Sequence, residues 1–160
     1  MSKDFDIQEA YKKLQSKHKL PSFEDLEEDF ELSFIDYKLK DDKLLLRSIR
    51  RKINEKIIFF CRIIEGLIYP QQASMITMIE GKQVTEEDKL KIEKFYKHLM
   101  FYERESLKLD VMPDEKKSAE YIINVEKLWR EYRKDMANVV QKMQTSWNSN
   151  DYEDKENYVG

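Results

Sequence analysis

Few residues in this chain are of the types that carry out covalent or metal chemistry, and their spacing does not assemble a site. Histidine occurs only at His18 and His98, and neither lies three residues after a carboxylate, as the Glu-x-x-His pairs of di-iron bundles require. The one cysteine, Cys61, lies in an apolar run, where a thiol serves as a small buried side chain. Glu103 and Glu105 are two positions apart, so on a helix they point to different sides. We therefore predict no enzyme, no metal site and no cofactor.

Cationic side chains offer a second kind of chemistry, the binding of phosphate. Charge is sorted along the chain: residues 22–36 hold seven acids and no base, whereas residues 37–56 hold eight bases and three acids. On a helix, bases that recur every four residues share one face. We name the resulting candidate site the basic ridge, which consists of Lys43, Arg47, Arg50 and Arg51.

The basic ridge has two main interpretations. It binds the phosphate backbone of a nucleic acid, with a strong dependence on salt. Alternatively, the acidic segment 22–36 folds back and neutralises the ridge, a surface pairing that stabilises little. A solvated face with no role is the remaining interpretation. The sequence carries no signature of a zinc finger, an RNA-recognition motif or a glycine-centred helix-turn-helix.

The elements that must position these residues are helices. Apolar residues make up 41% of the chain and charged residues 38%, a balance typical of helices with one buried stripe. Glycine and proline fall at or near the gaps between amphipathic segments, and Ser22 and Thr85 each precede an acid by three residues, as helix caps do. We expect five helices: one over about 7–19, a short one that begins after Ser22 and buries Phe23, Leu26 and Phe30, one that opens after Asp42 and runs to about 68, one from about 85 to 109, and one from about 113 to 147.

Apolar residues on the three long segments alternate by three and four positions, which predicts near-parallel packing with heptad-like contacts. The stripes are Ile53, Ile57, Phe60, Ile64 and Leu67; Ile92, Phe95, Leu99, Tyr102, Ser106 and Leu109; and Ile122, Val125, Trp129, Tyr132, Met136, Val139 and Met143. The second half of the third expected helix also carries Ile58, Phe59 and Cys61 on other sides, so we expect it to lie at the centre of the bundle.

The connection between the third and fourth expected helices is long for a bundle and rich in methionine and isoleucine. Long connections are usually functional or carry structure of their own, and flexible thioether side chains suit a contact surface. The alternative is that these side chains cap the end of the core. The candidate partner loop consists of Met75, Ile76, Met78 and Ile79.

Together these patterns predict an all-α protein with one domain over residues 1–147 and an acidic, disordered tail over 148–160. Residues 1–6 carry no secretory signal, and Arg62 and Glu65 interrupt the most apolar window, so we expect a cytoplasmic protein with no membrane segment. The favoured function is a non-enzymatic accessory factor that docks on RNA, DNA or a ribonucleoprotein through the basic ridge. The alternatives are a protein–protein adaptor or homodimer that uses the long C-terminal helix, and an enzyme whose carboxylates are scattered over several helices.

Overall fold

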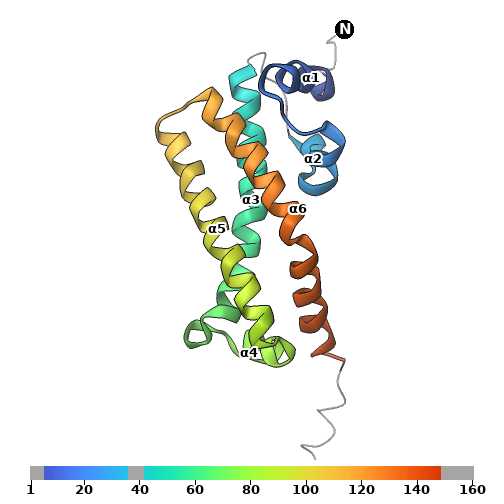
Figure 1. Cartoon of the computed structure of the whole chain (residues 1–160), viewed down its shortest axis with the longest axis vertical. Coiled ribbons are helices and arrows are strands. Elements are labelled where there is room, and N and C mark those ends of the chain that lie inside the picture. The colour runs from blue at the N-terminus through green and yellow to red at the C-terminus, as the bar shows by residue number, and fades with distance from the viewer. Residues whose placement is uncertain (1–5, 36–41, 149–160) are drawn as a thin grey trace, which may run out of the picture. The chain divides into compact units, whose positions relative to one another are not determined.

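The computed structural model describes residues 6–35 and 42–148, and 87% of these residues are helical, with no strand among them. The all-α prediction is confirmed. The helices are α1 (Ile7–His18), α2 (Phe23–Phe30), α3 (Asp42–Ile68), α4 (Met75–Glu80), α5 (Glu86–Val111) and α6 (Glu115–Thr145) (Figure 1). Short 3-10 turns occur at η1 (Leu32–Phe34), η2 (Pro70–Gln72) and η3 (Gly81–Gln83).

Side-chain caps fix where the helices begin. The Oγ of Ser22 accepts from the backbone N of Asp25 at 3.1 Å, which starts α2 as the sequence predicts. At the start of α5, Thr85 and Asp88 exchange two such bonds, at 3.0 and 3.1 Å, which is a complete capping box. The Oδ1 of Asp114 caps α6 in the same way. The sequence pattern does not predict α4, which lies inside the segment expected to be a connection.

The chain divides into two compact units, one of Met1–Cys61 with Lys97–Glu131 and one of Arg62–Tyr96 with Tyr132–Gly160. Each of the helices α3, α5 and α6 contributes residues to both units. One domain over residues 1–147 stays a prediction. The predicted disordered tail lies, beyond residue 148, outside the described residues.

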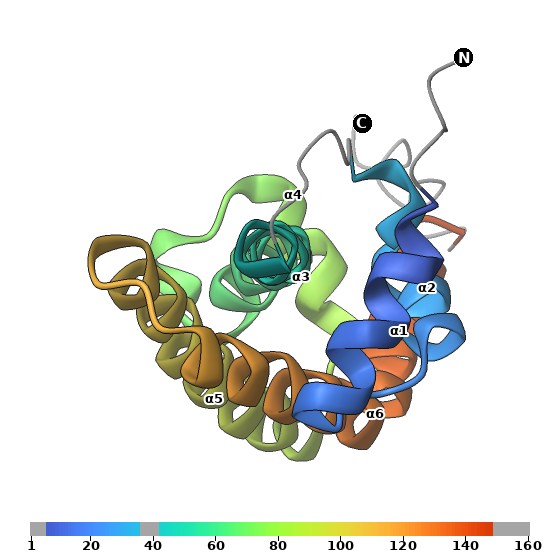
Figure 2. The same cartoon turned by 90° about the horizontal axis from the view of Figure 1, so that it is seen from above.

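In the first unit, aromatic side chains join α2, α3 and α6. The ring of Trp129 lies 5.0 Å from that of Phe60 and 6.3 Å from that of Phe30, measured between ring centres. The ammonium of Lys56 lies 4.8 Å from the centre of the Trp129 ring and donates to the backbone oxygen of Asp29. Figures 1 and 2 show α1 and α2 beside the N-terminal part of α6. Through these contacts α2 covers one side of the core of the first unit.

In the second unit, the parts of α5 and α6 that belong to it are joined by a ring pair and a polar cluster. Phe95 stacks on Tyr132 with ring centres 4.9 Å apart. Asp88 is buried and accepts from Lys142 and from Asn138. Because these contacts lie about two helical turns apart on α5, they fix the register of α5 against α6 in this unit.

Burial confirms most of the predicted stripes and corrects one expectation. The stripe residues that are buried are Ile53, Ile57, Ile64, Leu67, Ile92, Phe95, Leu99, Ser106, Leu109, Ile122, Val125, Trp129, Met136 and Val139. The expectation that Phe59 helps to bury the second half of α3 is wrong, because Phe59 is 58% exposed, whereas Ile58 is half-buried and Cys61 is buried. Phe59 is two positions from Ile57 and from Cys61, both buried, so it lies on the opposite side of the helix.

Candidate functional site

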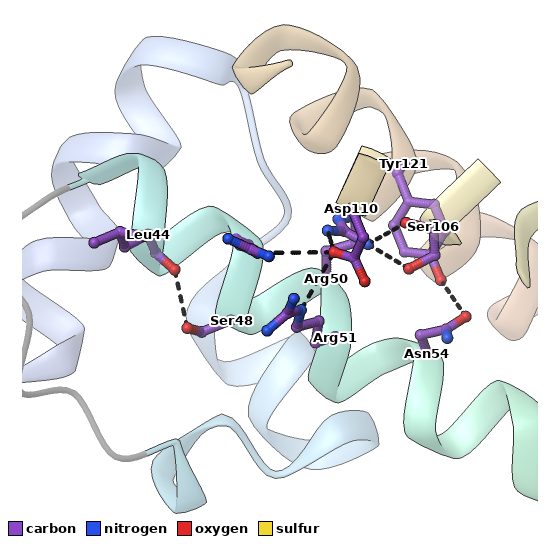
Figure 3. Close-up of polar contacts among 9 residues, drawn as sticks. Leu44, Ser48, Arg50, Arg51, Asn54, Ser106, Asp110 and Tyr121 are labelled. Carbon is purple, nitrogen blue, oxygen red and sulfur yellow. Dashed lines mark hydrogen bonds and ion pairs between the residues drawn. The ribbon is translucent and has the colours of Figure 1, made fainter. Parts of the chain in front are cut away.

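The arginines of the basic ridge meet on one carboxylate of α5. Arg50 is 1% exposed, and its Nη1 donates to both the backbone oxygen, at 2.7 Å, and the Oγ of Ser106. Its Nη2 pairs with Oδ1 of Asp110 (Figure 3). The same oxygen lies 3.3 Å from Nε of Arg51 and 3.7 Å from Nε of Arg47. Three guanidinium groups therefore share one carboxylate oxygen.

This cluster carries more positive than negative charge. Burial alone would raise the pKa of Asp110, but the hydrogen bonds and charges of Arg50 and Arg51 outweigh it and hold that pKa below its ordinary value. Asp110 is thus ionised at neutral pH and balances one of the three arginines. The side chains of Arg47 and Arg51 are 39% and 52% exposed, so the surplus charge faces solvent.

The expectation that Arg50 forms part of an exposed ridge is therefore wrong. Arg50 lies three residues before Ile53, which places it on the apolar stripe of α3 rather than on its outer face. The idea that the acids of α2 neutralise the ridge is also wrong for the described arginines, whose counterion is Asp110. On α2, Asp25 instead pairs with Arg130 of α6 at 2.7 Å. The side chain of Lys43 lies outside the described part of the chain.

A sequence signal for this cluster existed. The α5 stripe contains one polar residue, Ser106, and the α3 stripe, extended backwards by three positions, contains Arg50. Two polar residues on otherwise apolar stripes are expected to pair, because a buried polar group without a partner is costly. Asp110 lies one position after Leu109, outside the apolar stripe of α5, so the stripe pattern does not predict that it joins the cluster.

The candidate partner loop forms a short helix that reverses the usual arrangement. A surface helix normally turns its apolar side chains inward. In α4, Met75, Ile76 and Met78 are 78%, 58% and 62% exposed, whereas Thr77 faces the body of the second unit. A Cβ built on Gly66 of α3 would lie 2.7 Å from Cγ2 of Thr77, so the two helices touch at this point.

The exposure of these side chains decides between the two interpretations of the loop. The alternative has Met75, Ile76 and Ile79 capping the core, and it is wrong for Met75 and Ile76, since both are mainly exposed. Ile79 is half-buried. The apolar surface formed by Met75, Ile76 and Met78 is hereafter the α4 patch. At the other end of α4, Glu80 accepts from the ring nitrogen of Trp147 at 2.8 Å, so both ends of the helix are held.

The apolar stripe of α6 is mostly buried. Ile122, Val125, Trp129, Met136 and Val139 are buried, and of the large apolar side chains within residues 115–145 only Val140, at 41%, is exposed. The use of α6 as an adaptor or dimer interface stays a prediction.

The remaining reactive residues occupy structural positions. Cys61 is buried, as predicted, and His98 is exposed at the surface. The Nε2 of His18 lies 2.8 Å from Oε1 of Glu115. Over residues 6–35 and 42–148 the structure places no three His, Cys, Asp or Glu side chains where they could jointly hold a metal ion. No helix in the same ranges combines the length and apolarity that a bilayer span needs.

Comparisons with protein-family models, with characterised proteins and with solved structures gave no match. Function must therefore be inferred from the surfaces themselves.

Proposed function

We propose that this chain is a non-enzymatic helical adaptor that docks on a protein partner through the α4 patch. The observation that carries the proposal is the reversed orientation of α4, which places a threonine against Gly66 and two methionines in solvent. Burying each of these large apolar side chains in an interface would contribute about 1.5–3 kcal/mol. Three of them make a credible centre for a contact, since binding energy concentrates in a few buried anchors.

The packing of α4 indicates a fixed, exposed surface rather than a flexible loop. Ser74 caps the helix by accepting from the backbone N of Thr77 at 3.2 Å. Gly66 allows α4 to approach α3 closely, and Glu80 is held by Ser146 and Trp147. A surface fixed in this way loses little conformational entropy when it binds. Methionine adds adaptable shape, which suits partner recognition.

Site-specific photocrosslinking in the native host tests the proposal. A photoreactive residue at Met78 should give a discrete protein adduct, whereas the same residue at Leu90, 62% exposed on α5, should not. With the photoreactive residue kept at position 78, Met75→Glu together with Ile76→Glu should remove the adduct and leave the melting temperature unchanged. Equal adducts at both positions, or adducts that disappear with nuclease, would contradict docking through the α4 patch.

The arginine cluster favours a second candidate function, the binding of a nucleic-acid backbone. Arg47 and Arg51 are partly exposed, and the cluster with Asp110 has two uncompensated positive charges. Arginine matches phosphate through its planar array of donors. With two exposed arginines, affinity should fall about tenfold between 50 and 200 mM salt, because each phosphate contact releases counterions.

Fluorescence anisotropy with a labelled RNA or DNA oligonucleotide tests this candidate. Arg47→Gln with Arg51→Gln should weaken binding and flatten the salt dependence. Arg104→Gln, a change at an exposed arginine paired with its neighbour Glu103, is the matched control. Arg50 stays unchanged because it is buried. Unaltered affinity in the double variant would remove the arginine cluster from the nucleic-acid interpretation.

A further inference from the structure

A groove of about 380 Å³ lies between the C-terminal end of α2 and the middle of α3, within the first unit. Its apolar part consists of Phe30, Phe59 and Phe60, and Phe59 is 58% exposed. The volume is at the lower end of the range of ligand sites, so the groove suits a few side chains rather than a whole helix. The charged side chains that line it are Glu28, Asp29, Glu31, Lys52, Glu55 and Lys56. We name this site the α2–α3 groove.

The lining of the α2–α3 groove is negative, because four carboxylates lie against two ammonium groups. Both lysines are engaged. The Nζ of Lys52 lies 3.4 Å from Oε2 of Glu55. The ammonium of Lys56 lies over the ring of Trp129 and donates to the backbone oxygen of Asp29. The two surplus negative charges therefore have no lysine of the groove left to balance them.

The surplus charge lies at the C-terminal end of α2, where it does not stabilise the helix. The negative end of a helix dipole favours cations in the last turn. The last turn of α2 has no base, and Glu28 in that turn and Glu31 at the cap are both exposed. Neither forms an ion pair with another residue of the described ranges 6–35 and 42–148. Because rules of local stability are broken mainly at functional sites, these two acids indicate a ligand that supplies the cation.

We propose that the α2–α3 groove binds a basic segment of a partner protein, through an arginine that is next to an apolar side chain in that segment. The planar guanidinium matches a carboxylate such as that of Glu28 or Glu31, and it also stacks on an exposed aromatic ring such as that of Phe59. The apolar neighbour packs on the phenylalanines of the groove. Charge complementarity decides the class of partner, since a nucleic acid or an acidic segment would meet two surplus negative charges.

This inference goes beyond docking through the α4 patch and does not depend on it. The α4 patch belongs to the second unit, whereas the α2–α3 groove belongs to the first. Met75→Glu together with Ile76→Glu should therefore leave binding in the groove unchanged. The failure of one proposal is thus distinguishable from the failure of the other.

Fluorescence anisotropy of the full chain with short labelled peptides tests the proposal. The probe peptide alternates arginine and leucine. One control peptide has citrulline, the neutral analogue of arginine, in place of each arginine, and a second has serine in place of each leucine. We expect saturable binding of the arginine–leucine peptide, about fivefold or more tighter than the binding of either control.

The aromatic part of the groove is tested by Phe59→Ala, which should weaken binding of the arginine–leucine peptide about fivefold or more, as the loss of a central anchor does. Phe59 is mainly exposed, so the variant should fold. The matched control is Phe101→Ala, at a ring that is 64% exposed on α5. It should leave the affinity unchanged.

The acidic part is tested by Glu28→Gln together with Glu31→Gln, which should also weaken binding about fivefold or more. This change should not lower the melting temperature, because it removes charge from the negative end of α2. A loss of binding without a loss of stability cannot come from unfolding. Glu120→Gln together with Glu131→Gln, at two exposed acids of α6, changes the net charge equally and should leave the affinity unchanged.

Three results would overturn the proposal. Equal affinity for the citrulline peptide would mean that the guanidinium is not recognised. Equal affinity for the serine peptide would mean that the aromatic part of the groove takes no part. Equal losses in the groove variants and in their matched controls would mean that the peptide binds by a general attraction between charges.

Discussion

Arg50 of α3 and Ser106 of α5 are polar residues on apolar stripes, and they contact one another: Nη1 of Arg50 donates to both the backbone oxygen and the Oγ of Ser106. Any other alignment of the two helices within the first unit would leave a buried guanidinium facing apolar side chains. Because such a mismatch is costly, this pair favours one register of α3 on α5.

Removing either partner should therefore destabilise the protein. Arg50→Met removes the donor that the backbone oxygen and the Oγ of Ser106 share, and we expect the free energy of unfolding to fall by about 1–3 kcal/mol. Ser106→Ala removes one bond and should cost about 0.5–1.5 kcal/mol. Urea unfolding of both single variants and the double variant should show non-additive losses. Strictly additive losses would mean that the two residues do not interact.

The capping box of α5 should make stability depend on acid pH. The hydrogen bond from Lys142 is the main cause that lowers the pKa of Asp88 from 3.8 to about 2. A carboxyl whose pKa is depressed in the folded state stabilises the protein above the unfolded value, and that contribution is lost as pH falls toward 2. Asp88→Asn should cost about 1 kcal/mol at pH 7, and its difference from the parent should shrink as pH falls through 2.

Glu87→Gln serves as the control for this pH dependence, because Glu87 is exposed and pairs only along the helix surface with Lys91. Glu87→Gln should change the free energy of unfolding by no more than about 0.5 kcal/mol at every pH. Thermal melts across the acid range measure both variants. If the difference in melting temperature between Asp88→Asn and the parent stayed constant down to pH 2, the role of the charge would be contradicted.

The contact of Gly66 with Thr77 predicts an unusual sign for a glycine substitution in a helix. Replacing a helical glycine by alanine ordinarily stabilises by about 1 kcal/mol. Here the new Cβ would lie 2.7 Å from Cγ2 of Thr77, so Gly66→Ala should instead destabilise by about 1–3 kcal/mol. Adding Thr77→Ser to Gly66→Ala removes Cγ2 and should recover the lost stability. Denaturant unfolding that shows Gly66→Ala to be more stable than the parent would refute the close approach of α4.

Trp129 is the largest side chain at the junction of α2, α3 and α6 in the first unit. It is buried against Phe60 and Phe30, so Trp129→Ala should cost about 3–5 kcal/mol. Phe60 is only half-buried, and its replacement by alanine should cost less than that of Trp129. Denaturant melts compare the two variants. A loss below about 1 kcal/mol at Trp129 would mean that the ring does not belong to the core.

The helices were largely predictable, because their signals are local. Ser22, Thr85 and Asp114 each cap a helix where the sequence places one, and the spacing of the apolar stripes anticipated burial. The helix α4 was missed because its six residues are too few to show a period, and its apolar side chains are exposed rather than buried.

The candidate sites were predictable only in part. The four-residue spacing of Arg47 and Arg51 was recognised, but spacing alone could not show that Asp110, about sixty positions further along, would lie against them. The charge of Arg50 predicts a surface position and its place on the stripe predicts burial, and in the structure Arg50 is buried. The α2–α3 groove depends on the packing of two helices, which no local pattern reports.

The exposure of the two methionines of the α4 patch can be measured directly. With ¹³C-labelled methionine methyl groups, a soluble paramagnetic agent broadens each signal according to its access to solvent. The account predicts that Met75 and Met78 broaden as strongly as exposed Met112, and far more than Met136, which is 2% exposed. If Met75 and Met78 are instead as protected as Met136 in the full chain, the patch is covered by the protein itself, and the docking proposal is contradicted.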